Sequence, residues 1–147
     1  MTIATGANAV RTRLEALVGE WEVELSFPND PPGTVHIPAS FAWLEDGDFL
    51  LYRLGDTATG APHSTCIIGG DASTDSYAAL YADDRGVSRV YQMRLDGGEW
   101  TMWRKSSGFS QRFVGTFDGD AIIARWEKSP DDVHWEHDFD LRYRRLT

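Results

Sequence analysis

Two short segments contain residue types that occur in catalytic or metal sites, but the spacing of these residues argues against a shared site. His63 and Cys66 are three positions apart, and so are His134 and His137. In a β-strand, residues three apart point to opposite faces, so neither pair can share a proton or a metal ion. We therefore expect no catalytic constellation and no metal site. His137 stays a candidate by itself, because its predicted strand turns it toward the interior with Phe139.

Three arginines are candidates for holding an anion. Arg112 and Arg125 lie in neighbouring predicted strands whose two faces are both mixed. If their face points inward, two guanidiniums enter the interior and can hold a carboxylate or phosphate in bidentate fashion. If it points outward, they are surface arginines. Arg89, two residues before Tyr91, poses the same choice.

Aromatic residues are frequent, with six Trp, five Tyr and seven Phe among 147 residues. On inward faces they either stack on a flat ligand or fill the interior, and the sequence favours neither outcome. With the polar candidates, the predicted ligand-binding set is Trp21, Phe41, Trp43, Arg89, Tyr91, Trp103, Arg112, Arg125, His137 and Tyr143.

Composition narrows the class of protein. The net charge of −9 disfavours nucleic acid and anionic membrane surfaces as partners. A single cysteine forms no internal disulfide, and the N-terminus lacks a signal-peptide pattern, so we expect a cytoplasmic protein. The length suits one domain. A homodimer is compatible with the sequence.

The start of the domain combines two periods. Residues 1–7 are expected to be disordered, and residues 8–18 to form a short amphipathic helix capped by Asn8. Gly19 is expected to end this helix in a left-handed conformation. From Glu20 the period becomes two, which predicts a strand with one apolar face.

Short alternating segments follow, separated by Gly, Asp and Pro turns. After the strand that starts at Glu20, strands are predicted at 35–44, 48–54, 64–69, 76–82, 87–95, 99–105, 110–117, 121–128 and 133–145. This is an all-β pattern, and it predicts an antiparallel barrel of roughly ten strands within a single domain, 8–147. Closure would pair the last strand with the first, placing Glu20, Glu22 and Glu24 outside beside Arg142 and Arg144.

Gly19-Glu20-Trp21, with basic residues late in the final strand, resembles the Gly-x-Trp and closing-arginine arrangement of the calycin superfamily, which includes lipocalins and fatty-acid-binding proteins. Three longer runs are similar to bacterial proteins of unassigned function in the DUF1579 group: YADDRGVSRVYQM, GEWTMWRKSSGFSQRFVGTF and ARWEKSPDDVHWEHDFDLRYRR. Both resemblances imply a calycin-like barrel, and neither implies a reaction.

The chain also resembles nitrobindins, ten-stranded barrels that hold haem through a histidine on the last strand. His137 is the residue that this resemblance would make the ligand, although Val23-Glu24-Leu25 replaces the glycine-rich part of the family's first motif.

Three functions are therefore expected as alternatives. The first is a barrel that binds a small, partly apolar and possibly anionic ligand, without a resident cofactor. The second is an enzyme that uses His137 or a tyrosine as acid or base. The third is a haem protein.

Overall fold

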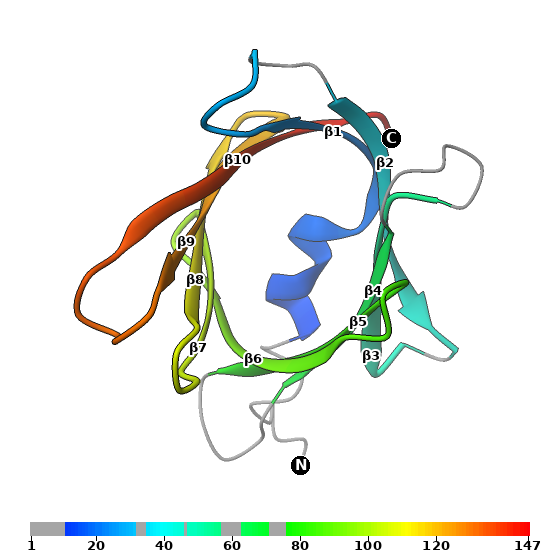
Figure 1. Cartoon of the computed structure of the whole chain (residues 1–147). Helices are drawn as coiled ribbons and strands as arrows, with labels where there is room; N and C mark the ends of the chain where they lie inside the picture. Colours follow the sequence, from blue (N-terminus) through cyan, green and yellow to red (C-terminus); the bar gives the residue numbers. More distant parts are fainter. Residues whose placement is uncertain (1–10, 32–34, 46, 57–62, 71–75) are drawn as a thin grey trace.

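Ten alternating segments form ten strands in the structure, a computed structural model that describes residues 11–31, 35–45, 47–56, 63–70 and 76–147. The strands are β1 (Gly19–Ser26), β2 (Val35–Leu44), β3 (Phe49–Leu54), β4 (Ser64–Gly70), β5 (Tyr77–Asp83), β6 (Ser88–Asp96), β7 (Glu99–Arg104), β8 (Ser110–Asp118), β9 (Ala121–Ser129) and β10 (Glu136–Arg145). Each pairs antiparallel with its chain neighbours, and β1 pairs with β10, so the sheet closes (Figure 1). The predicted all-β, ten-stranded barrel is confirmed.

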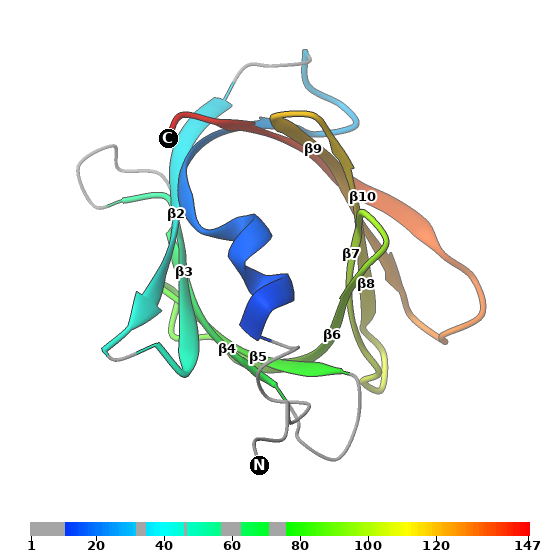
Figure 2. The ribbon, with the colours of Figure 1, turned by 180° about the vertical axis from the view of Figure 1, so that it is seen from behind.

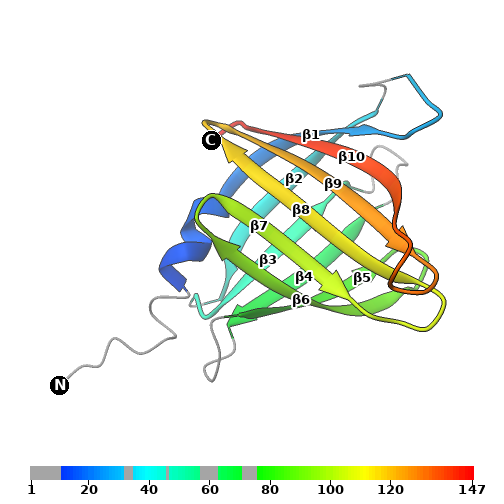
Figure 3. The ribbon, with the colours of Figure 1, turned by 90° about the vertical axis from the view of Figure 1, so that its left-hand side faces the viewer.

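A short helix covers one end of this barrel. Residues 11–14 form an α-helical turn that continues into the 3-10 helix η1 (Glu15–Leu17). Leu14 and Leu17 are buried in the core. The helix lies across the opening when the barrel is viewed from either end, and at one end from the side (Figures 1, 2 and 3). The predicted disordered segment 1–7 and the predicted cap Asn8 lie outside the described residues.

Arg145 joins the helix to both closing strands. Its guanidinium donates to the carbonyl oxygens of Ala16, at 2.6 Å, and Val18, at 2.7 Å, and lies 4.2 Å from the ring centroid of Trp21. The Trp21 Nε1–H donates to the Leu17 carbonyl at 2.9 Å. Carbonyls at the end of a helix have no partner within it, so these bonds satisfy them, and for the buried Leu17 carbonyl the bond also avoids a desolvation penalty.

Gly19 has a different role from the predicted one. The helix ends at Leu17 and Val18 is extended, so Gly19 is the first residue of β1 and does not cap the helix. Its φ is +138°, and a Cβ there would lie 2.6 Å from the Thr147 carbonyl oxygen. Glycine is required because the C-terminal backbone passes directly over this position.

The register of the closing strands matches the expected charge pairing. Glu22 lies opposite Arg144 and Glu24 opposite Arg142. Arg144 donates to Glu22 at 3.0 Å, and this hydrogen bond is the main cause of the lowered pKa of Glu22. Both side chains are largely exposed, so the pair selects a register and adds little stability.

The last strand contains an irregularity that the alternation does not reveal. It begins at Glu136, whereas the pattern predicts 133. His137 pairs with Glu127 but Phe139 pairs with Trp126, so Asp138 is an extra residue in a β-bulge. Residues before the bulge therefore point to the opposite face from the predicted one.

Replacing Gly19 by alanine tests the close approach at the barrel seam. Gly19→Ala is expected to lower the free energy of unfolding by about 2 kcal/mol or more, because it combines an unfavourable φ with a steric clash. Urea unfolding followed by tryptophan fluorescence would measure the loss. Gly119→Asn is the control, since its φ is +60° and a Cβ there meets nothing within 4 Å. Equal losses for the two variants would contradict this account.

Candidate functional site

A cavity of about 260 Å³ opens at the barrel end opposite the helix. Its wall includes the end of β3 at Leu54, the β5–β6 turn at Arg85, the β7–β8 turn at Phe109 and the start of β10 at Phe139. All four lie at the end of the barrel away from the helix. The helix end is filled by side chains, and the mouth end is hollow.

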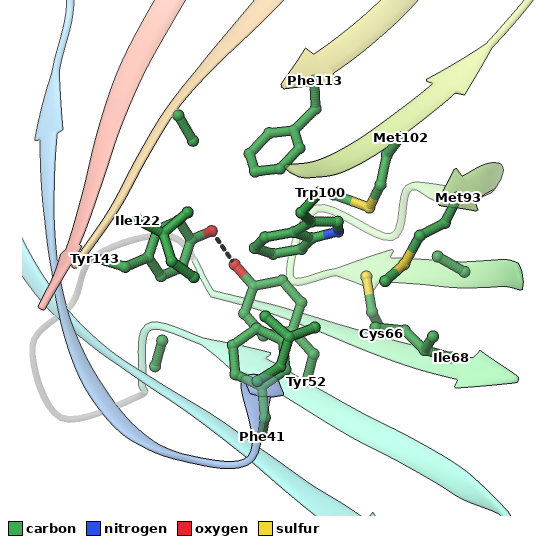
Figure 4. Close-up of a cluster of buried hydrophobic side chains, with 14 of the residues drawn as sticks. Phe41, Tyr52, Cys66, Ile68, Met93, Trp100, Met102, Phe113, Ile122 and Tyr143 are labelled. Carbon is green, nitrogen blue, oxygen red and sulfur yellow. Dashed lines mark hydrogen bonds between the residues drawn. The ribbon is translucent and has the colours of Figure 1, made fainter. Parts of the chain in front are cut away.

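Four phenols line this cavity, from Tyr52, Tyr81, Tyr91 and Tyr143. The Tyr52 and Tyr143 hydroxyls hydrogen-bond each other at 2.6 Å, and Figure 4 shows them meeting beside the Trp100 ring. Burial is the main cause that raises the pKa of all four phenols. They are therefore neutral hydrogen-bonding groups near neutral pH.

A polar row crosses the wall near the mouth. The Tyr91 hydroxyl donates to Gln111 Oε1 at 2.9 Å, and Arg104 approaches the same oxygen at 3.5 Å. Arg89 lines the cavity nearby, with its guanidinium 5.3 Å from the ring centroid of Phe109. Gln111 is 7% exposed, so this row is part of the interior wall.

Some charges in the wall are neutralised within the protein. Asp83 accepts from the Tyr81 hydroxyl at 2.7 Å and from Arg85 at 2.6 Å, and its side chain is 4% exposed. Asp138 lies 3.9 Å from Lys128. Among the described residues, no carboxylate lies within 4.0 Å of Arg89 or Arg104. The described charged residues that line the inner cavity itself are Arg85, Arg89 and Asp138, so this lining has a positive formal charge in a chain whose net charge is −9.

A second chamber of about 410 Å³ adjoins the first and shares Tyr81, Arg85 and Phe139 with it. Its wall is mainly apolar and includes Phe27, whose ring packs on that of Phe139 with centroids 5.3 Å apart. The two chambers together give room for a ligand larger than the inner cavity alone.

Three predicted ligand-binding residues line the inner cavity: Arg89, Tyr91 and Tyr143. The alternation in β6 and β10 predicts the inward direction of Tyr91 and Tyr143, because each of these strands has one apolar face there, whereas the sequence leaves the direction of Arg89 open.

Three others lie at the helix end. Trp21 and Phe41 are 1% exposed and belong to the packed core. Trp43 donates from Nε1 to Glu15 Oε1 at 3.0 Å, so it holds the helix. Their placement in a ligand site is not supported by the geometry, because the helix and its neighbours occupy that space.

Arg112, Arg125 and Trp103 lie on the outer face. Trp103 pairs with Arg112 on the face opposite the buried Phe113. Arg112 donates to Glu127 at 2.8 Å and stacks on Trp135 with 4.0 Å to the ring centroid. Arg125 is exposed beside the outward Val114. The alternative in which these arginines enter the interior is wrong.

His137 also lies outside, which corrects the predicted inward orientation. Its Nε2 is 2.8 Å from Asp140 Oδ1, on the outer face of β10. The bulge at Asp138 is the physical reason, because one extra residue reverses every side chain before it. His137 therefore does not fit the role of haem ligand that the nitrobindin resemblance implies, nor that of a base in the cavity. No histidine is among the described residues lining the inner cavity.

Sequence reasoning missed several lining residues, among them Tyr52, Gln111, Trp126 and Arg85. Tyr52 lies in a strand that is apolar on both faces, so alternation gives no direction. Gln111 is on the same face as Phe113, but both faces of this strand are mixed, so the pattern does not fix its direction. Arg85 is brought in by a turn.

Cys66 lines the cavity as a protonated thiol, because burial raises its pKa to about 12. No group of three or more metal-ligating side chains occurs in the described part of the chain. No helix among the described residues is long and apolar enough to cross a membrane.

Comparison with known proteins supports the fold. No protein-family model matches the chain, and no curated protein matches it in sequence. The crystal structure of Rv2717c from M. tuberculosis superposes with a TM-score of 0.62 at 13% identity, over 92% of this chain and 98% of that chain. At this identity the likeness shows a shared barrel fold alone. It does not distinguish the DUF1579, lipocalin and nitrobindin resemblances.

The Asp83 cluster at the mouth predicts a pH-dependent stability. The hydrogen bond from Arg85, followed by that from Tyr81, lowers the pKa of Asp83 below its ordinary value. A lowered pKa in the folded state means that the stabilisation is present above the unfolded-state pKa of about 3.9 and is lost as the pH falls through the folded pKa. Asp83→Asn should therefore destabilise the protein most at pH 7 and by a smaller amount at pH 3, where the loss has begun but is not complete, as measured by urea unfolding at both pH values.

Asp118→Asn, an exposed aspartate at the end of β8, is the control for this measurement and should change stability little at either pH. A loss for Asp83→Asn that is the same at pH 7 and pH 3 would show that the carboxylate charge is not what stabilises the turn.

Proposed function

We propose that this barrel binds a small, partly apolar anion in the mouth cavity, with Arg89 as the anchor for the negative charge. The observation that carries the proposal is the Arg89 guanidinium on the cavity wall, without a described carboxylate within ion-pair distance, while Arg85 and Asp138 in the same wall are each paired. A partly desolvated cation gains most from a counter-charge that enters with the ligand.

The rest of the wall fits this ligand class. Aromatic and aliphatic side chains such as Phe113, Trp126 and Leu141 supply most of the surface, and a few polar groups interrupt it. Binding sites for small molecules combine an apolar surface with a small number of orienting polar groups in this way. The adjoining apolar chamber would receive a bulky or extended part of the ligand.

The chemistry of the wall favours binding over acid–base catalysis. The phenol pKa values and that of Cys66 are raised, and that of Asp83 is lowered, so each of these groups is moved away from neutrality. A general acid or base works best with a pKa near the working pH. Non-covalent binding needs no such group.

The proposal can be tested with two fluorescent probes that differ mainly in charge, 1-anilinonaphthalene-8-sulfonate and the uncharged N-phenyl-1-naphthylamine. Arg89→Met is expected to weaken binding of the sulfonate about tenfold or more, because a hydrogen bond to a charged group is lost. The affinity for the uncharged amine is expected to change by less than about twofold. Fluorescence titration measures both affinities.

Arg125→Met is the matched control, because it removes the same charge from the outer face. It should leave both affinities unchanged. Equal weakening of the sulfonate by the two variants would show that net charge alone attracts the probe, and absence of sulfonate binding to the unmodified protein would overturn the proposal.

A further inference from the structure

The deepest polar feature of the cavity is the pair of phenols Tyr52 and Tyr143. We infer that this pair recognises a neutral hydrogen-bond acceptor, such as a carbonyl oxygen, at the inner end of the same anionic ligand. The inference rests on the proposed function and adds the ligand's second functional group, so the ligand class becomes an apolar body with an anion at one end and a carbonyl-type oxygen at the other.

Counting hydrogen bonds shows that the pair has a donor to spare. Each tyrosine hydroxyl has one proton to donate, and one of the two protons is used in the 2.6 Å bond between them. Neither hydroxyl has another hydrogen bond to a described residue. Tyr52 is 5% exposed and Tyr143 1% exposed, so bulk solvent has little access to the second proton. A buried donor without an acceptor is unfavourable, and a ligand acceptor would remove that penalty.

Neighbouring aromatic rings hold the two tyrosine side chains in place. The Tyr52 ring stacks on Phe41 with centroids 4.2 Å apart, and Trp100 packs against both tyrosines at 5.9 and 5.7 Å. These contacts fix the two rings, so the hydroxyls are held in position before any ligand arrives.

Trp100 supplies a second unused donor in the same cluster. It is fully buried, and its Nε1 is the buried side-chain polar atom that has no hydrogen-bond partner among the described residues. Figure 4 shows this nitrogen at the edge of the ring away from the tyrosine pair. Trp100 is not among the residues that line the cavity, so the spare donor at its inner end is that of the tyrosine pair, which matches an oxygen acceptor and disfavours a hydrocarbon end.

The state of the phenols agrees with a neutral partner. Burial raises the pKa of Tyr52 and of Tyr143, so both remain protonated donors. Arg89 and Arg104, which have no described carboxylate within 4.0 Å, are at the mouth. Arg89 lies over the Phe109 ring, and Arg104 donates to the Phe109 carbonyl and to Gln111. Negative charge is therefore favoured at the mouth, and a neutral acceptor at the inner end.

Two benzoates provide the test, 4-acetylbenzoate and 4-isopropylbenzoate, which share the carboxylate, the ring and nearly the same shape and differ in the carbonyl oxygen. Isothermal titration calorimetry of the unmodified protein is expected to show a preference of roughly threefold to tenfold for the acetyl compound. The double variant Tyr52→Phe/Tyr143→Phe is expected to lose this preference. Replacing both hydroxyls leaves no unpaired phenol, so the variant should remain folded.

Tyr77→Phe is the control, because it removes a buried phenol that does not line the inner cavity, and it should keep the preference. The inference would be overturned if both benzoates bind in a way that depends on Arg89 but without a preference for the acetyl compound. It would also be overturned if the preference survives in the double variant. Either result would leave the proposed function standing. If neither benzoate binds, or if Arg89→Met weakens neither, both the proposed function and the inference fail.

Discussion

The structure depends on the way Arg145 ties the end of the helix to the seam of the barrel. One guanidinium donates to the carbonyl of Ala16 in the helix and to that of Val18 just after it, and stacks on Trp21, while Gly19 lets the C-terminal backbone pass at close range. These contacts link the helix, β1 and β10 at one point. They both close the sheet and fix the helix over one end, so it follows that the hollow part of the interior lies at the other end.

The division of the interior into a packed half and a hollow half has a geometric cause. A ten-stranded barrel is wider than side chains alone readily fill. At the helix end, Leu14 and Leu17 add volume to the core, and the rings of Trp21, Phe41 and Trp100 meet edge to face. The mouth end receives no such insert from the described residues. There the aromatic rings line the cavity, and the packed pair Tyr52 and Trp100 lies between the two halves.

Sequence patterns predicted the barrel and the inward direction of Tyr91 and Tyr143 for the same physical reason. Where a strand has one apolar face, as in β1, β6 and β10 beyond the bulge, alternation fixes the direction of every side chain, so the seam register and the inward Tyr91 and Tyr143 followed directly. In β8 and β9 both faces are mixed, so alternation does not fix the direction of Arg112 and Arg125; Phe113 and Trp126 point inward, and both arginines therefore lie outside.

The error at His137 has another origin. A bulge inserts one residue without changing composition, and Trp135, His137 and Phe139 keep their alternation through it, so the sequence carries no mark of the reversal. Turn residues are equally hidden from periodicity. Arg85 enters the cavity wall because the carboxylate of Asp83 binds its side chain and its backbone N–H, which is a property of one turn.

The placement of charge sets the limits on what the cavity can hold. An acidic chain has many carboxylates available to neutralise a cation in the cavity wall, and Asp83 does so for Arg85. Arg89 has no such partner among the described residues, although it is only partly exposed. A cation left in this state lowers stability relative to a paired one, and a ligand that brings the missing charge recovers the difference as binding free energy. The cavity thus has two polar groups that the described residues leave without a full set of partners. One is the guanidinium of Arg89 at the mouth, and the other is the spare hydroxyl proton of the tyrosine pair further in.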